Sequence, residues 1–200
     1  MERVRALPGV ESAALASTVL LGGSAFGNDV RVLDSAPTRE RASNAFHTWV
    51  DAEYFTTMRV PIVMGRALTD DPARANEIVI NEILARRLWP GENPIGKHVR
   101  GHSRDLEVVG LARDGRYITM GMSDVPFVFN AAAYGYSPRM TVHVRTRENV
   151  AVAINRIREQ VRLLDPNVAL EREGALSPII GISLLPQRIG RPRPIRSPRL

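Results

Sequence analysis

Residues 91–97 carry the residue types and the spacing of a nucleotide-binding loop. Gly91, Gly96 and Lys97 match the pattern G-x-x-x-x-G-K, in which glycine amides and the lysine surround a phosphate at the start of a helix. His98 stands where the pattern needs a Ser or Thr hydroxyl for Mg²⁺, and Pro94 removes one amide donor. The sequence also predicts a helix before this segment and a strand after it, the reverse of the required order. We therefore interpret the segment as a structured turn from a helix to a strand.

Four histidines are the remaining candidates for metal ligands. His98 and His102 are four residues apart, which is ligand spacing when both side chains project from one face of a helix. Gly101 between them, and the lack of a cysteine or carboxylate pair nearby, favour a loop with solvated histidines. His47 and His143 lie in strand-like patterns and alternate away from the apolar face, so we predict that both are surface residues. The sequence predicts no metal site.

No group of residues predicts catalysis. A serine nucleophile would need an elbow such as G-x-S-x-G, which the sequence lacks. Arg86 and Arg87 stand near the end of a predicted helix, where they complement the helix dipole or are simply solvated. Acidic residues in predicted loops are turn formers rather than members of a catalytic pair. They are Asp70, Asp71, Asp105 and Asp114. We therefore predict a protein that is not an enzyme, with no catalytic, cofactor-binding or metal-binding residues and no cofactor.

The composition is that of one globular domain of ordinary size. The chain has 200 residues, of which 44% are hydrophobic and 24% charged, enough for a sizeable core. It has no cysteine, which excludes disulfides and thiolate metal sites. The formal net charge is +6, but residues 188–200 hold five arginines and no acidic residue. Without those five, 22 basic side chains face 21 acidic ones, so the body offers no basic groove and we predict no nucleic-acid partner.

No stretch of the sequence has the length and apolar composition of a membrane span, which needs roughly 18 residues. Residues 12–28 are uncharged but are broken by glycines, and Pro8 and Glu11 disfavour a secretory signal peptide at this end. We therefore predict that this chain has no transmembrane anchor of its own and no clear signal peptide.

The pattern of elements predicts an α+β fold, a mixed sheet with helices packed on one face. Predicted helices cover residues 1–7, 52–58 (capped by Asp51), 82–88 (capped by Asn81) and 149–164. In the last helix, apolar residues recur every three or four positions: Val150, Ile154, Ile157, Val161 and Leu164. Predicted strands cover residues 10–19, 29–33, 46–50, 78–80, 106–111, 127–129, 140–144 and 168–170. The final strand is expected to pair with 140–144 across the last helix.

Several stretches, in order along the chain, resemble one known family. They are LPGVESAALAS (7–17), DAEYFTTMRVPIVMGRALTD (51–70), IVINEILARRLWPGENPIGKHV (78–99), EVVGLARDGRY (107–117), VRTRENV (144–150), VRLLDPNVAL (161–170) and SLLPQRI (183–189). Over about residues 1–189, the chain resembles the extracytoplasmic MacB-like periplasmic core domain of FtsX-type ABC transporter permeases. The segment NEILARRLWPGENPIGK is the most specific marker, and in that family it is a structural helix and turn.

The resemblance implies a two-lobed α+β domain on the extracytoplasmic side of the cell membrane, without catalytic residues. Its implied function is mechanical: the domain couples ATPase-driven movement of membrane helices to a periplasmic partner or substrate. The implied partners are an ABC ATPase subunit, further permease copies and a periplasmic adaptor. The alternatives are a stand-alone soluble interaction module that lost its membrane anchor, and a small nucleotide-binding protein that uses the loop of Gly91 to Lys97.

The sequence departs from the family at both ends. No transmembrane helix precedes the domain, which is therefore N-terminally incomplete, and after LPQRI an Arg/Pro-rich stretch replaces the family's apolar membrane segment. We predict the MacB-like domain over residues 1–187 and a disordered tail over residues 188–200. Our hypothesis is a truncated permease fragment whose tail comes from a shifted reading frame. The alternative is a basic tail that binds anionic lipid or nucleic acid.

Overall fold

The computed structural model describes residues 1–19, 22, 26–33, 41–118, 125–134, 139–171 and 173–176. Its helices are α1 (Glu2–Arg5), α2 (Tyr54–Met58), η1 (Pro72–Arg74), α3 (Glu82–Leu88), η2 (Ala132–Tyr134) and α4 (Val150–Leu164). Its strands are β1 (Val10–Ala16), β2 (Phe26–Val32), β3 (Ala42–Val50), β4 (Ile62–Gly65), β5 (Glu77–Asn81), β6 (His98–Gly101), β7 (Arg104–Ala112), β8 (Phe127–Ala131) and β9 (Thr141–Thr146). The predicted tail and its boundary at residue 187 lie outside the described residues.

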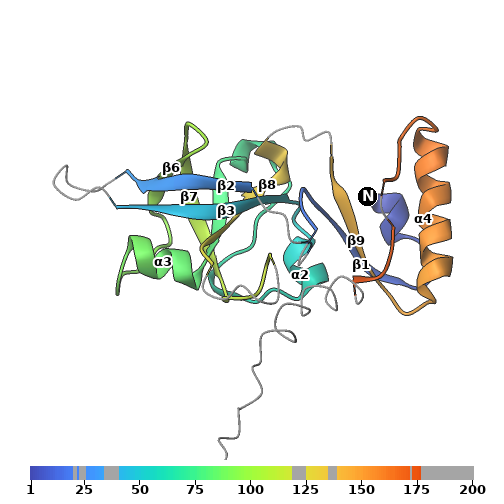
Figure 1. Cartoon of the computed structure of the whole chain (residues 1–200), viewed down its shortest axis with the longest axis horizontal. Coiled ribbons are helices and arrows are strands. Elements are labelled where there is room, and N and C mark those ends of the chain that lie inside the picture. Colours follow the sequence, from blue (N-terminus) through green and yellow to red (C-terminus); the bar gives the residue numbers. More distant parts are fainter. Residues whose placement is uncertain are drawn as a thin grey trace, which may run out of the picture.

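Six strands close into a ring. β2 pairs with β3 and with β6, so the order β2-β6-β7-β5-β8-β3 returns to β2. The β3–β8 and β5–β7 pairs are parallel, whereas the other neighbours in the ring are antiparallel. β1 and β9 extend from β3, and β4 pairs with β7. Figure 1 shows the ring at one end of the molecule and β1, β9, α1 and α4 at the other. The predicted α+β class with a mixed sheet is confirmed.

The ring encloses one of two hydrophobic cores. Each ring strand contributes to it, together with Leu84 and Leu88 of α3: Val30, Val32, Ala45, Ile78, Ile80, Val99, Leu106, Val108, Leu111 and Val128. Val79 belongs instead to a second core, which contains Tyr54 and Phe55 of α2. Successive side chains of a strand point to opposite faces, so α2 and α3 pack on opposite faces of the sheet. The helices are therefore distributed over both faces, and not gathered on one as the sequence suggested.

Two of the predicted helices form with the predicted caps or bounds. Asn81 caps α3, since its side-chain oxygen accepts a hydrogen bond from the amide of Leu84. α4 covers Val150–Leu164 and is capped by Asn149. The predicted cap of α2 is wrong, because the side chain of Asp51 makes no capping bond and instead pairs with Arg5. The reason is that β3 ends at residue 50 and turns the Asp51 carboxylate inward, toward α1.

The strand predicted over residues 168–170 is wrong. These residues are exposed and belong to no strand, and within the described residues β9 pairs with β1 alone. β4 and β6 were not among the predicted strands. No helix of the described residues has the length and hydropathy to cross a membrane.

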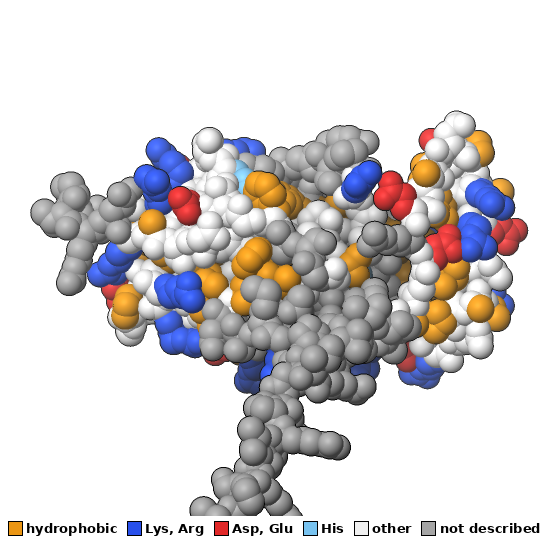
Figure 2. All heavy atoms as spheres, viewed as in Figure 1, with side chains coloured by type: hydrophobic (Ala, Val, Ile, Leu, Met, Phe, Trp, Pro, Cys, Tyr) orange, Lys and Arg blue, Asp and Glu red, His pale blue; other side chains and the backbone are white. Residues whose placement is uncertain are grey.

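The apolar stripe of α4 is only partly covered. Ala153 is the buried residue of this helix, whereas Val150 and Leu164 are 42% and 60% exposed. Figure 2 shows hydrophobic side chains between charged ones at the end of the molecule formed by α4. The periodicity thus predicts the helix correctly, but it does not predict how much of the helix the rest of the chain buries.

Candidate functional site

The loop of residues 91–97 joins a helix to a strand, as the sequence predicts, but that strand is β6 and not the one predicted over residues 106–111. The amide of Gly96 donates to the carbonyl of Val108 (2.8 Å) and so is engaged within the fold. The Lys97 ammonium forms an ion pair with Glu92, and it lies 5.6 Å from the centre of the Trp89 ring. These contacts occupy the groups with which a phosphate loop would hold its ligand. The loop is a structured turn whose Gly96 amide and Lys97 ammonium are bonded within the fold.

Glu92 holds this turn against α3. Its carboxylate also accepts a hydrogen bond from Arg41 (3.0 Å), and the same guanidinium nitrogen donates to the carbonyl of Leu88 near the end of α3 (3.3 Å). Hydrogen bonds from Lys97 and then Arg41 lower the pKa of the Glu92 carboxyl below its usual value. Both ion pairs are exposed, so each contributes little to stability and serves to position the loop.

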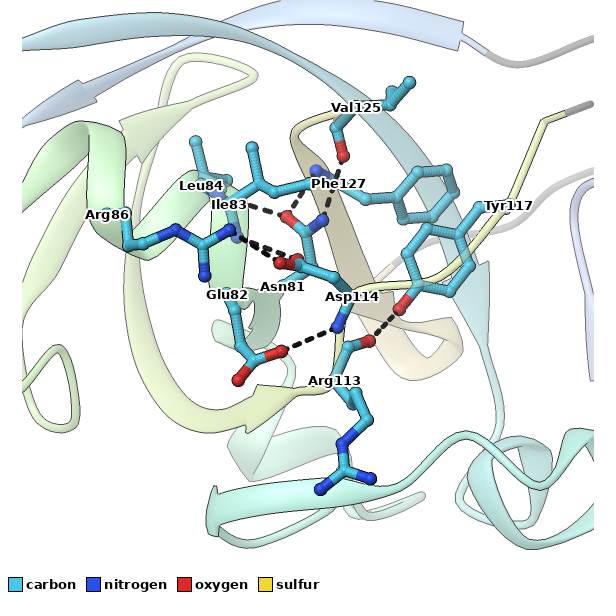
Figure 3. Close-up of polar contacts among 10 residues, drawn as sticks. All are labelled: Asn81, Glu82, Ile83, Leu84, Arg86, Arg113, Asp114, Tyr117, Val125 and Phe127. Carbon is cyan, nitrogen blue, oxygen red and sulfur yellow. Dashed lines mark hydrogen bonds and ion pairs between the residues drawn. The ribbon is translucent and has the colours of Figure 1, made fainter. Parts of the chain in front are cut away.

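The start of α3 is fixed by Asn81, which has no exposed surface. Its side-chain oxygen accepts hydrogen bonds from the amides of Leu84 (3.2 Å) and Phe127 (2.9 Å). Its side-chain nitrogen donates to the carbonyl of Val125 (2.9 Å). Figure 3 shows the amide of Asn81 between α3 and the start of β8. One side chain therefore caps the helix and joins it to a strand that lies more than 40 residues further along the chain.

A second set of bonds ties the segment after β7 to the same end of α3 (Figure 3). Asp114 accepts a hydrogen bond from the amide of Ile83 (2.8 Å) and forms an ion pair with Arg86 (2.7 Å). In return, the amide of Asp114 donates to the carboxylate of Glu82 (2.9 Å). Two carboxylates at the first turn also complement the helix dipole. We call Asn81, Glu82, Arg86 and Asp114 the α3 network. Arg86 is thus bonded rather than simply solvated.

The chemistry of the α3 network is structural. Its carboxylates and amide are bonded to backbone groups and to Arg86, and the nearby hydroxyl of Tyr117 donates to the carbonyl of Arg113. Burial, with a smaller contribution from the charge of Asp114, raises the pKa of Tyr117, so this phenol stays protonated. The side chains of the α3 network therefore hold the start of α3 to the segment after β7 or to β8.

The prediction that His47 and His143 are surface residues is wrong. His47 has no exposed surface, and His143 is also buried, with its ring nitrogen 3.3 Å from the carbonyl of Thr18. The physical reason is that both faces of β3 are covered: Ala45, on the same face as His47, packs in the ring core, and Val50, on the opposite face, packs in the second core. Alternation along this strand therefore does not separate inside from outside. A sequence cannot reveal this, since the closure joins β2 to β6 over a long separation.

His47 belongs to an aromatic cluster with Phe26, Trp49 and His102. The ring of His102 lies 4.5 Å from that of His47, 5.2 Å from that of Trp49 and 5.7 Å from that of Phe26, between ring centres. Asn130 donates to the carbonyl of Thr48 through its side-chain nitrogen, which therefore also faces the Nδ1 atom of His47 (3.3 Å). Burial, and then the proximity of His102, lower the pKa of His47 to about 4.

The other candidate residues do not converge. His98 is exposed in β6, whereas His102 turns into the aromatic cluster, so the two do not share a helical face. The described residues contain no group of three or more His, Cys, Asp or Glu side chains that could hold a metal ion. Asp70 and Asp71 accept bonds from backbone amides in loops, as predicted. Asp105 lies in β7 and pairs with Arg100 of β6 (2.7 Å), which corrects its predicted place in a loop.

The attachment of α1 is a feature that the sequence did not predict. Arg5 forms an ion pair with Asp51 (2.8 Å), and its Nε atom donates to the carbonyl of Ala13 in β1 (2.9 Å). Beyond α1, the carbonyl of Pro8 accepts a bond from Arg156 of α4 (3.3 Å). A helix of four residues is unstable in isolation, so these contacts determine where α1 lies. Arg5 and Asp51 are 46 positions apart, and no local pattern marks them as partners.

Known proteins with a similar sequence or fold were found by comparison. The family model described as MacB-like periplasmic core domain matches residues 1–160. The periplasmic region of MacB from Actinobacillus actinomycetemcomitans is similar, with 18% sequence identity and a TM-score of 0.58 over 82% of this chain and 71% of that chain. The extracellular domain of the ABC-type transporter YknZ from Gram-positive bacteria is 17% identical, with a TM-score of 0.58 over 83% of this chain and 80% of that chain. A search of curated proteins found no match.

Proposed function

The chain belongs to the family of MacB-like periplasmic core domains, which are periplasmic domains of ABC-type transporter permeases, and on that premise we propose that it is a non-enzymatic body that transmits movement. In this proposal, ATP-driven displacement of membrane helices reaches the domain through α1 and is passed on to a periplasmic partner or substrate. An ABC ATPase subunit, further permease copies and a periplasmic adaptor are the proposed partners. The proposed location is the extracytoplasmic side of the membrane.

The observation that carries the proposal is the way α1 joins a closed ring. α1 is bonded through Arg5 to β1 and to Asp51 at the end of β3, and β3 is itself a ring strand. The ring has paired neighbours on both sides of β2, and the α3 network adds bonds between elements that are distant in sequence. A displacement applied to α1 in its docked position would therefore move the ring as one unit.

Site-directed spin labelling tests this proposal directly, because the chain has no native cysteine. Labels at the exposed positions Glu2 of α1 and Glu107 of β7 report the distance between α1 and the ring. In membranes that contain the domain with its ABC ATPase, we expect this distance to stay unchanged when ATP is added. A third label on the ATPase subunit should then move relative to both positions.

Two results would contradict the proposal. A change in the distance between positions 2 and 107 on addition of ATP would mean that the domain deforms instead of transmitting. An ATPase cycle that leaves all three distances unchanged would mean that the domain receives no movement.

The alternative of nucleotide binding at residues 91–97 has a separate test. Because Lys97 is paired with Glu92 and the Gly96 amide is bonded to Val108, calorimetric titration with ATP should give no saturable heat. Saturable binding that is lost in Lys97→Ala would restore this alternative. Glu92→Gln releases the ammonium without removing it, and is the matched control.

A further inference from the structure

The carboxylate that holds α1 is buried and only half satisfied. Asp51 is 5% exposed, and its Oδ2 atom accepts a hydrogen bond from Arg5 at 2.8 Å. Its Oδ1 atom is shielded from solvent and has no hydrogen-bond partner in the described part of the chain. An ionised carboxylate in this position is costly, since one ion pair does not replace the hydration that both oxygens lose.

Three charged groups face Asp51 from three different elements. Arg5 comes from α1, Asp70 from the loop before η1, and Glu53 from the segment that leads into α2. β1 contributes the carbonyl of Leu15, which accepts a bond from the amide of Asp51 (3.1 Å). The two carboxylates oppose ionisation of Asp51 and Arg5 favours it. The side chain of Arg5 is 32% exposed, so solvent screens its attraction.

We propose that Asp51 sets how firmly α1 docks on the body, and that uptake of a proton by Asp51 tightens this docking. Protonation ends the cost of burying the charge and the repulsion from Asp70 and Glu53. Arg5 then loses its ion pair but keeps its hydrogen bond to the carbonyl of Ala13. The ion pair alone would predict that acid weakens the docking of α1. The opposite is expected here, because the cost of desolvating the Asp51 carboxylate outweighs its attraction to Arg5.

The direction follows from linkage between proton binding and docking. Burial raises the pKa of Asp51 from its ordinary 3.8 to about 6, although hydrogen bonding of its carboxyl with the backbone of Leu15, and then the charge of Arg5, oppose the rise. When α1 undocks, water reaches the carboxyl and its pKa falls toward the ordinary value. The docked state therefore binds the proton more tightly, so docking is weakest above pH 6 and strengthens as the pH falls through 6. One unit between two pKa values is a factor of ten, so with a docked pKa of about 6 we expect roughly a 10-fold change in the docking equilibrium between about pH 7.5 and pH 5.0.

Amide exchange measured by NMR on the chain alone tests this inference. The amide of Ala6 bonds to the carbonyl of Glu2 only while α1 is formed, and the buried methyl groups of Val4 report its contact with the body. After correction for intrinsic exchange, protection of the Ala6 amide should rise as the pH is lowered from about 7.5 to 5.0. Asp51→Asn, which mimics the neutral acid, should show high protection at both pH values.

Glu11→Gln is the matched control, because Glu11 is an exposed carboxylate of β1 that pairs with Arg147. It should leave the pH dependence of Ala6 protection unchanged. If protection in the wild type falls or stays the same as the pH is lowered from about 7.5 to 5.0, the inference is overturned. The same conclusion would follow if Glu11→Gln removed the pH dependence.

Arg5→Met separates the desolvation of Asp51 from its attraction to Arg5. This variant also keeps the test decisive if Asp51→Asn does not fold. Without the cation, ionised Asp51 is uncompensated, so protection of Ala6 at pH 7.5 should drop and the pH dependence should become larger. If the ion pair were dominant, Arg5→Met would abolish the pH dependence instead. The idea that docking of α1 regulates transmission rests on the proposed function. The pH dependence of docking in the isolated chain does not rest on it, so the inference and the proposed function can fail separately.

Discussion

The α3 network and the attachment of α1 differ in how their buried polar groups are bonded. In the ring, the side chain of Asn81 has its oxygen and nitrogen bonded, and Asp114 uses both carboxylate oxygens. At the attachment of α1, Asp51 leaves one oxygen unbonded, and α4 leaves Leu164 exposed. A fully bonded network fixes one arrangement, whereas a half-bonded one can be shifted by a proton or a partner. The comparison separates a fixed α3 network from an adjustable attachment of α1.

The largest effect is expected from truncating the core side chain of α3. Leu84 is fully buried among ring residues, so Leu84→Ala should lower the free energy of unfolding by about 3 kcal/mol. Leu164→Ala removes the same atoms from the exposed end of α4 and should change it by less than about 0.5 kcal/mol. Urea denaturation of both variants measures the difference. Equal losses would mean that the end of α4 is as well packed as the ring.

Removing the cap of α3 should cost somewhat less. Asn81→Ala loses the helix cap and leaves the amide of Phe127 and the carbonyl of Val125 unpaired in the core, for a loss of about 2 kcal/mol. Asn149→Ala removes an exposed cap of α4, whose side chain accepts a bond from the amide of Ala151, and should cost about 1 kcal/mol or less. Thermal unfolding compares the two caps. The comparison is contradicted if Asn149→Ala lowers the free energy of unfolding by more than Asn81→Ala does.

Asp114→Ala should cost about 1 kcal/mol in the free energy of unfolding, since water can replace part of its partly buried bonds to Ile83 and Arg86. Its specific effect should be local: faster exchange of the Ile83 amide. Asp105→Ala, which removes an exposed ion pair with Arg100, should leave that amide unchanged. If Asp114→Ala and Asp105→Ala speed exchange of the Ile83 amide to the same degree, the α3 network does not fix the start of α3.

Protonation of His47 at acidic pH should lower the free energy of unfolding. Its pKa in the folded chain is about 4, below the ordinary 6.5, so between these values the unfolded chain binds more protons and stability falls as the pH falls. From about pH 6.5 to 5.5 the loss is at most about 1 kcal/mol. His47→Asn should show a smaller slope than the wild type, whereas His98→Asn at an exposed position should keep the wild-type slope. Identical slopes for all three proteins would exclude His47 as the source.

Local patterns predicted the elements, and non-local contacts decided what those elements bury. Asn81 before an apolar helical run is sufficient to predict α3 and its cap, because both partners lie within one turn. The burial of His47 and the pairing of Arg5 with Asp51 depend on strands that meet over tens of residues, so no window of sequence contains them. The loop of residues 91–97 was predicted correctly as a turn because its order of helix and strand is local.

The closed ring also dictates an order of events during folding. β2 can pair with β3 as soon as residue 50 is available, but its second neighbour, β6, begins only at residue 98. At a synthesis rate of about 5–20 residues per second, β2 waits roughly 2 to 10 s with one edge unpaired. Pairings over such long separations also place the domain among slow folders, on a scale of milliseconds to seconds. An exposed strand edge is a template for association, so the interval before β6 arrives is when this chain is most exposed to aggregation.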